Sequence, residues 1–442
     1  MGKSIKVKAS EDRLITPCGL ILAGALLVKT ALGGIVDKLG KTVDATHKNA
    51  SCVMAYIGLL CQGKTSYEDV REMQEDPEFH CQALHIESIP SAETMRQRLD
   101  EIAPEICDTN IVMQQSAALL REAGISPTPV FTGHVPIDVD VSVHDNSKTK
   151  KEGVGWTYKK VDGYSPIYAY IGEEGYVCNV KLRSGTSHSQ CEGTVEYLAD
   201  TLRMARGITD GKLLVRMDSG NDSIDNIKLF VKEGADYVIK RNLRQESLVE
   251  WEINAMKHGK KTQPRDGKVV YTGSIFRDRV GVKEPLRIVF RVTKRTMLAN
   301  GQFLITPEIE VDTWWTSLDI SEEEVIRLYC DHATSEQFHS EMKTDIGLER
   351  FPSGKFKTNA VILQLAALAF NTLRIMGQTA LSFGEKITRH DVQRLRIKTV
   401  ITRFMFIAGR IITHARQTFL TLGRSNIWRD IFGRMYEAFS ST

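Results

Sequence analysis

Residues 135–143 constrain the fold of this chain more than any other segment. Apolar and polar side chains alternate there, with Asp138, Asp140 and Ser142 as the polar set. Alternation with a period of two predicts a β-strand with one polar face. On such a strand Asp138 and Asp140 point to the same side, about 7 Å apart. The segment therefore predicts a sheet that presents two carboxylates on one face.

The segments that follow predict a sheet combined with helices. Residues 167–171 and 176–182 are rich in β-formers and flank a Gly-Glu-Glu-Gly turn, which predicts a hairpin. Helical and strand patterns then alternate, with a helix at 192–204, a strand at 212–217, a helix at 223–231 and a strand at 236–240. The order β-β-β-α-β-α-β predicts an α/β fold with an RNase H-like mixed-sheet core.

The 442 residues are enough for several domains at roughly 100–200 residues each. Residues 1–128 read as a helical N-terminal region, in which a cap at Ser91 is compatible with a DNA-binding helix-turn-helix or with a plain helical bundle. We predict the following division: a helical DNA-binding region at 1–128, the first part of the core at 129–242, a β-rich insertion at 243–317, a second core part with a long helix at 318–350, and a basic helical region at 351–442.

The charges of the chain are segregated. The net charge of +3 comes from 58 basic and 55 acidic residues, which excludes a uniformly basic DNA-coating protein. Residues 351–442, however, contain fourteen Lys and Arg against four acids, a local excess of +10, so the remaining residues sum to −7. Such an excess favours contact with a phosphate backbone through the release of counterions.

Cysteine and apolar patterns indicate a cytoplasmic protein. The eight cysteines include no C-x2-C pair, which argues against a zinc ribbon and suits reduced thiols. The longest apolar run, residues 14–28, is shorter than the ~20 residues that a membrane span needs. We expect this run to form a buried helix and expect no membrane association.

Four acids at three places in the chain form a candidate site for divalent metal ions. Asp218 ends an apolar strand, and Asp140 and Asp138 lie on the strand described above. Glu336 belongs to a helical stripe with Tyr329, His332 and Lys343, because steps of three, four and seven keep side chains on one helical face. Carboxylate oxygens bind hard cations, and two such ions suffice for phosphodiester cleavage.

The same residues carry a family resemblance. The segment resembles the Y-x2-R-x3-E-x6-K signature of DDE transposases encoded by bacterial insertion sequences. Tyr329, Glu336 and Lys343 match it, and His332 stands where the signature has arginine. Asp140, followed by Ser142, resembles the first aspartate of such enzymes, and Asp138 is a possible additional acid. Asp218 resembles the second, and residues 348–356 and 369–374 are similar to one branch of the group.

The resemblance implies a specific activity. Asp140, Asp218 and Glu336 would be the catalytic residues and would hold Mg²⁺, with Mn²⁺ as a substitute. The enzyme would bind double-stranded DNA, cleave it at the terminal inverted repeats of an insertion sequence and join the ends to target DNA. It would act as a homodimer in the DNA complex, in the bacterial cytoplasm and associated with the nucleoid. The expected DNA-binding residues are Tyr329, His332, Lys343, Lys355 and Arg374.

Other interpretations remain open at the level of sequence. His332 is expected to be a weaker phosphate contact than arginine, because neutral imidazole lacks a permanent charge and a bidentate grip. The chain is also compatible with an RNase H-like nuclease that does not join DNA, or with a DNA-binding protein whose catalytic site is unused. His134 and His144 are interpreted as ordinary loop or edge histidines, and at least one of Trp314 and Trp315 as a packing residue.

Overall fold

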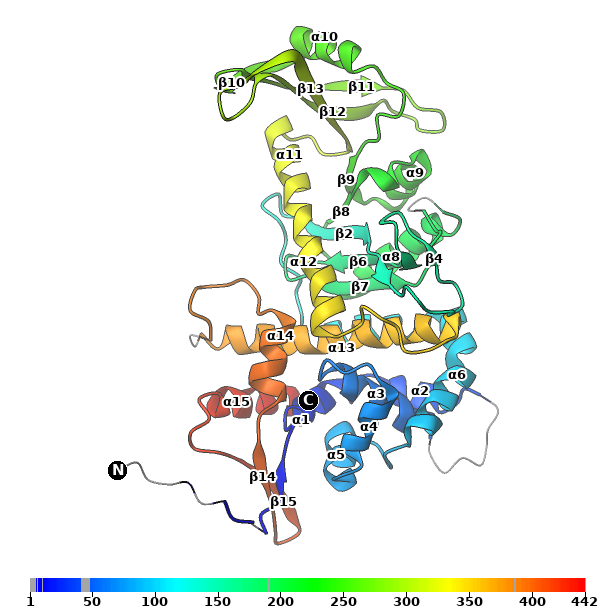
Figure 1. Ribbon diagram of the computed structural model, residues 1–442, viewed down its shortest axis with the longest axis vertical. Coiled ribbons are helices and arrows are strands. Elements are labelled where there is room, and N and C mark those ends of the chain that lie inside the picture. The colour runs from blue at the N-terminus through cyan, green and yellow to red at the C-terminus, as the bar shows by residue number, and fades with distance from the viewer. Residues whose placement is uncertain are drawn as a thin grey trace.

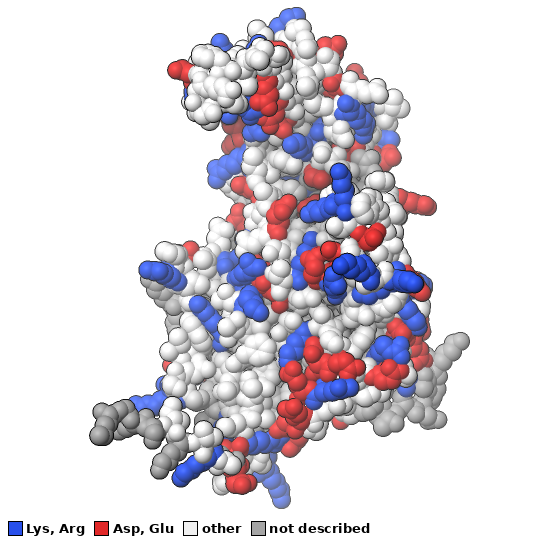
Figure 2. Space-filling model, viewed as in Figure 1, with Lys and Arg blue, Asp and Glu red and all other residues white. Residues whose placement is uncertain are grey.

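The computed structural model describes residue 5 and residues 7–9, 11–40, 48–188, 191–384 and 387–441. Its elements form a tall molecule in three levels (Figure 1). A β-rich part lies at the top, the central strands and helices lie below it, and the long helix α13 (Phe356–Ser382) separates these strands from the N- and C-terminal elements. Lys, Arg, Asp and Glu side chains are interspersed over the face shown in Figure 2, as expected for a chain with nearly balanced charge.

A nine-stranded mixed sheet, in the order β10-β11-β12-β13-β9-β8-β2-β6-β7, forms the centre of the fold. Strand β2 pairs antiparallel with β6 and parallel with β8, which in turn is parallel to β9. The strands and helices predicted here are confirmed with small shifts at their ends. Their bounds are β2 Val135–Val141, β6 Ile167–Ile171, β7 Tyr176–Lys181, α8 Thr194–Ile208, β8 Leu213–Met217, α9 Ile224–Glu233 and β9 Asp236–Lys240.

Strand β2 differs from its prediction in one respect, since both of its faces are covered. Asp138, expected on a polar face, is only 3% exposed. The alternation was a correct signal for a strand, but the acid lies inside the protein because Arg216 of the neighbouring strand β8 pairs with it. A buried charge is tolerated where such a partner exists.

The insertion extends the central sheet rather than forming a separate unit. Its strands are β10 Lys260–Arg265, β11 Lys268–Arg277, β12 Leu286–Met297 and β13 Phe303–Thr316, and β13 pairs antiparallel with β9. Strand β13 is the longest of these, with 14 residues. Helix α10 (Leu248–His258) was not predicted, although Ser247 and Glu250 provide a start signal: the Ser247 side chain accepts a hydrogen bond from the Glu250 backbone.

The segment with Glu336 is a composite of helical types. Helix α11 (Glu322–Asp331) starts with a capping box of Ser321 and Glu324. A 3-10 turn (His332–Thr334), helix α12 (Ser335–Ser340) and a π-helical turn (Glu341–Asp345) follow without a break. π-helical turns are frequent at functional sites.

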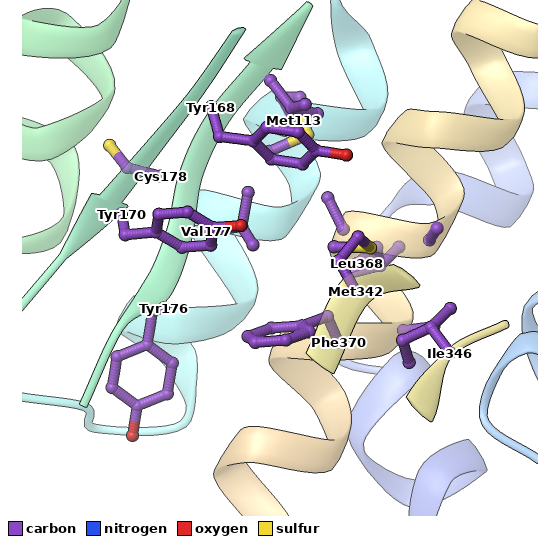
Figure 3. Close-up of a cluster of buried hydrophobic side chains, with 14 of the residues drawn as sticks. Met113, Tyr168, Tyr170, Tyr176, Val177, Cys178, Met342, Ile346, Leu368 and Phe370 are labelled. Carbon is purple, nitrogen blue, oxygen red and sulfur yellow. The ribbon is translucent and has the colours of Figure 1, made fainter. Parts of the chain in front are cut away.

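Helix α13 is the core helix of the molecule. Its length and hydropathy would allow it to cross a membrane, but 94% of its most apolar 18-residue window is buried inside the protein. Sheet strand β7 and helices α6 and α7 pack against it. The hydrophobic residues around it form one continuous core (Figure 3). The apolar helix is therefore explained by packing.

The N-terminal region is a helical layer packed on α13. Its elements are α1 Leu20–Leu27, α2 Leu32–Val36, α3 Asn49–Leu60, a 3-10 turn Tyr67–Asp69, α4 Val70–Met73, α5 Pro77–Leu84, α6 Ala92–Thr109 and α7 Ile111–Glu122. The buried helix expected in the first apolar run is confirmed as α1. Ser91 caps α6, whose apolar face is fully buried. The helix-turn-helix and the plain helical bundle both stay predictions for this layer.

The C-terminal region contains a hairpin where continuous helix was predicted, so that prediction is wrong. Helix α14 (Ile397–Val400) and a π-helical turn (Ile401–Met405) precede strands β14 (Gly409–His414) and β15 (Gln417–Leu422), and α15 (Arg429–Ser440) ends the chain. Strand β14 pairs with β1 (Leu14–Ile15) near the other end of the sequence. A small three-stranded sheet of β3 (His144–Asp145), β5 (Asp162–Tyr164) and β4 (Gly155–Trp156) completes the fold.

Candidate active site

Asp140 and Asp218 lie at the same edge of the sheet. Asp140 is near the end of β2, and Asp218 follows β8 directly. The two strands are parallel neighbours, so their carboxyl ends meet. Burial raises the pKa of Asp218, and the negative charge of Asp140 raises it further. The two carboxylates are therefore close enough to repel each other.

The Asp140 carboxylate is held by two donors. The backbone N–H of Val141 donates to Oδ1 at 2.7 Å, and Nε2 of His339 donates to Oδ2 at 3.2 Å. Burial raises the pKa of Asp140, but the hydrogen bond and charge of His339 outweigh it, so the net pKa is lowered. Asp140 is thus kept ionised. His339 was not singled out from the sequence, although it lies three residues after Glu336 and seven after His332, on the same helical stripe.

Glu336 and Asp140 both line a cavity of about 250 Å³. Lys343, Lys159 and Tyr158 are among the other residues that line it. Burial raises the pKa of the Tyr158 hydroxyl to about 12, together with the charges of Asp140, Asp218 and Glu336. The charges of all three predicted acids therefore reach the Tyr158 hydroxyl. Burial lowers the pKa of Lys343, and the nearby Lys159 lowers it further.

Asp138 is committed to a buried ion pair. Arg216 donates from Nε to Oδ1 at 2.6 Å and from Nη2 to Oδ2 at 2.7 Å, and His332 Nδ1 lies 3.0 Å from Oδ1. Burial raises the pKa of Asp138, whereas Arg216 and His332 lower it, and the net direction is down. Arg216 also donates to the Leu328 carbonyl at 2.9 Å, so the pair ties α11 to the sheet. Both carboxylate oxygens of Asp138 are used in this way.

His332 is 6% exposed and points at Asp138. Burial lowers its pKa, but the Asp138 carboxylate raises it more, and the net pKa lies above the ordinary value. Tyr329 is partly buried, with its ring centroid 5.7 Å from that of Trp314 and 6.1 Å from that of His332. The hydroxyl of Tyr329 lies within reach of the charges of Asp218 and Asp140, whereas His332 is bonded to the buried Asp138.

The two remaining predicted DNA contacts differ in position. The Lys355 side chain is 58% exposed and pairs with Asp100 at 3.1 Å, at the start of α13. Arg374 is fully buried. Its guanidinium donates to Glu341 and, at 2.7 Å, to the Leu395 carbonyl. The structure places Arg374 in the core, where it offers no surface to a DNA phosphate.

Four aromatic or imidazole side chains are structural, as interpreted from the sequence. His134 Nε2 lies 3.1 Å from Asp236 Oδ2, at the amino ends of strands β2 and β9. His144 is fully buried between the Leu348 carbonyl and the Tyr168 hydroxyl, and burial lowers its pKa to about 3. Trp314 and Trp315 are both buried. None of the four is placed as a metal or base-stacking group.

Comparison with known proteins identifies the family. The family model described as "Transposase DDE domain group 1" matches residues 2–442. The chain belongs to the DDE transposase family. No curated protein gave a match. Seven chains of solved structures match, among them one from the cryo-EM structure of the piggyBac transposase synaptic complex with hairpin DNA. It shares 11% sequence identity over 98% of this chain and 84% of that chain, with a TM-score of 0.42.

DDE transposases use divalent metal ions, and the donors at this edge fit such ions. Asp140 and Asp218 supply carboxylate oxygens, the ligands that hard cations prefer. Their repulsion, which raises the pKa of Asp218, is what a bound cation would relieve. Within the described ranges no group of three or more His, Cys, Asp or Glu side chains already surrounds one point. Asp140, Asp218 and Glu336 are the residues that would hold the ions.

Proposed function

We propose that this DDE transposase binds the terminal inverted repeats of a bacterial insertion sequence, cleaves DNA at the element ends and joins them to target DNA. The observation that carries the proposal is that Asp140 and Asp218 lie at the carboxyl ends of two parallel neighbouring strands, and that Glu336 lines the same cavity as Asp140. Mg²⁺, or Mn²⁺ in its place, would activate water or a 3′-hydroxyl and stabilise the leaving oxygen when bound.

The chain's own residues prepare this site for DNA. Asp140, Asp218 and Glu336 are oxygen donors on three different elements, so their arrangement depends on the packing of α12 against the sheet. Lys343 and Lys159 line the same cavity and would neutralise a phosphate placed beside the carboxylates. Tyr329 borders the site and would contact the DNA backbone, whereas His332, bonded to Asp138, would act mainly beneath the surface.

We propose that strands β7-β6-β2-β8-β9 form an RNase H-like core. Support comes from their order and directions: β7, β6 and β2 are antiparallel, and β2, β8 and β9 are parallel. The insertion adds its strands beyond β9.

DNA outside the active site would be bound in part by the basic C-terminal region. Arg389, Arg416 and Arg424 are exposed there, while Lys386 lies outside the described residues. We further propose a homodimer on DNA, with one subunit cutting each end, in a bacterial cytoplasm and associated with the nucleoid.

The test is cleavage of a duplex that carries the element's end, in Mg²⁺, by the wild type, Asp218→Asn and Asp225→Asn. Asp225 is the matched control, because it is an exposed aspartate of α9 that pairs with Lys228. We expect Asp218→Asn to abolish cleavage and Asp225→Asn to leave it unchanged. Equal cleavage by the wild type and Asp218→Asn would contradict the proposal.

A second DNA added to the same reaction separates the alternatives. Joined products are expected of a transposase. Cleavage without joining would identify a nuclease, and DNA binding without cleavage would identify a protein with an unused site.

A further inference from the structure

Two histidines of the Glu336 segment bond the two aspartates of β2. His332 Nδ1 lies 3.0 Å from Asp138 Oδ1, and His339 Nε2 lies 3.2 Å from Asp140 Oδ2. The histidines are seven residues apart, about two helical turns, and the aspartates are two apart on one strand face. Figure 1 shows α11 and α12 running across β2 and β6. The two pairs therefore fix where the helix that carries Glu336 meets the strand that carries Asp140.

The two pairs have different consequences. Asp138 is already saturated by Arg216, so His332 adds to a buried structural pair. Within the part of the chain that the structure describes, His339 is the basic side chain hydrogen-bonded to Asp140, and Asp140 lines the cavity. The His339 pair therefore acts directly on a carboxylate of the proposed metal site.

His339 is itself held rigidly. It is 6% exposed, and its Nδ1 lies 3.2 Å from the hydroxyl of Tyr170. The ring stands edge-on to Tyr168 and Tyr170, at centroid distances of 5.1 and 5.3 Å. Those two tyrosine rings stack parallel to each other, and Figure 3 shows them projecting from β6 towards the segment of Met342. The imidazole thus has little freedom to turn away from Asp140.

The direction of the hydrogen bonds follows from the groups involved. An ionised carboxylate only accepts, so Nε2 of His339 carries the proton that faces Asp140. The other ring nitrogen, Nδ1, lies 3.2 Å from the Tyr170 hydroxyl, which donates to a neutral imidazole and accepts from an imidazolium, so the contact holds in either state. The chain of bonds runs from Tyr170 through His339 to Asp140, and each Asp140 oxygen retains further acceptor capacity.

We propose that His339, held by Tyr170, is a positioning residue that orients the Asp140 carboxylate for a divalent cation. This inference rests on the proposed function, in which Asp140 is a metal ligand. Groups that hydrogen-bond metal ligands from behind typically change metal affinity by ~10–100-fold when removed. His339 does not touch DNA or the cation in this role.

The test measures Mn²⁺ binding to the full chain without DNA by isothermal titration calorimetry, with thermal unfolding in EDTA as a check on folding. We expect His339→Ala to weaken Mn²⁺ binding by ~10–100-fold. His339→Gln should restore most of it, because its side-chain amide can donate from near the place of Nε2. Tyr170→Phe should weaken binding less than His339→Ala.

The matched control is His134→Gln, which alters a His–Asp pair of similar length at the amino ends of strands β2 and β9. It should leave Mn²⁺ affinity unchanged. Wild-type affinity in His339→Ala, with Asp140→Asn strongly weakened, would overturn the positioning role alone. Wild-type affinity in Asp140→Asn would overturn the proposed metal site itself. If His339→Ala does not fold, wild-type affinity in Tyr170→Phe overturns the inference, and weakened affinity there supports it.

Discussion

Substitution of Arg374 tests whether this residue stabilises the core or binds DNA, because the sequence predicted a DNA contact and the structure places the side chain in the core. The family resemblance predicted that Arg374 binds DNA. In the structure its guanidinium is fully buried and paired with Glu341, whose side chain is also fully buried. Arg374→Met removes the positive partner and leaves the Glu341 carboxylate uncompensated. Breaking a buried pair in this way costs about 3–5 kcal/mol of unfolding free energy. The Leu395 carbonyl also loses its donor.

The assay is urea unfolding followed by tryptophan fluorescence, for the wild type, Arg374→Met and Arg374→Met/Glu341→Leu. The single variant should lose about 3–5 kcal/mol, and the double variant should recover much of it, because two apolar side chains replace both buried charges. Arg389→Met, at an exposed arginine, is the control and should unfold like the wild type.

DNA binding at several salt concentrations completes the test. If Arg374 contacted a DNA phosphate, Arg374→Met would lower the salt dependence of DNA binding by about one ion and would leave the unfolding curve at its wild-type position. That result would refute the buried-pair reasoning.

Three further changes have defined outcomes. Asp138→Asn leaves Arg216 buried without its charged partner, so chemical unfolding should show a loss of about 3–5 kcal/mol. Burial and the charge of Asp140 raise the pKa of Asp218, so ionising it destabilises the folded state. This destabilisation is absent below the unfolded pKa of about 4, grows as pH rises from there to the folded pKa, and is constant above it. Metal-free Asp218→Asn should therefore be more stable than the wild type at pH 7, and denaturation curves should converge in acid. Gly175→Ala would place a Cβ 2.1 Å from the Phe338 ring at a φ of +71°, so both thermal stability and end cleavage should fall.

The parts of the fold that sequence predicted are those set by local patterns. The strands of Asp140 and Asp218 and the helix of Glu336 follow from alternation, apolar runs and helical spacing. Asp140 and Asp218 lie at the same end of the sheet because β2 and β8 are parallel neighbours. The prediction that Glu336 and Lys343 share a face is also confirmed, since both line one cavity.

The parts that sequence missed depend on long-range packing. Nothing near Arg374 indicates that Glu341, 33 residues away, will pair with it. The hairpin of β14 and β15 forms against β1, almost 400 residues earlier in the chain, so its segment lacks a decisive local signal. His339 likewise gains its meaning only when α12 packs beside β2, which brings its ring to Asp140.

We propose that Asp218, together with Asp140 and Glu336, holds the metal ions with which the protein cuts DNA. The most direct measurement is end cleavage by Asp218→Cys in Mg²⁺ and in Mn²⁺. A thiolate is a poor ligand for Mg²⁺, whereas Mn²⁺ accepts sulfur more readily. We expect little or no cleavage by this variant in Mg²⁺ and recovery of cleavage in Mn²⁺. Wild-type cleavage by Asp218→Cys in Mg²⁺ would contradict it.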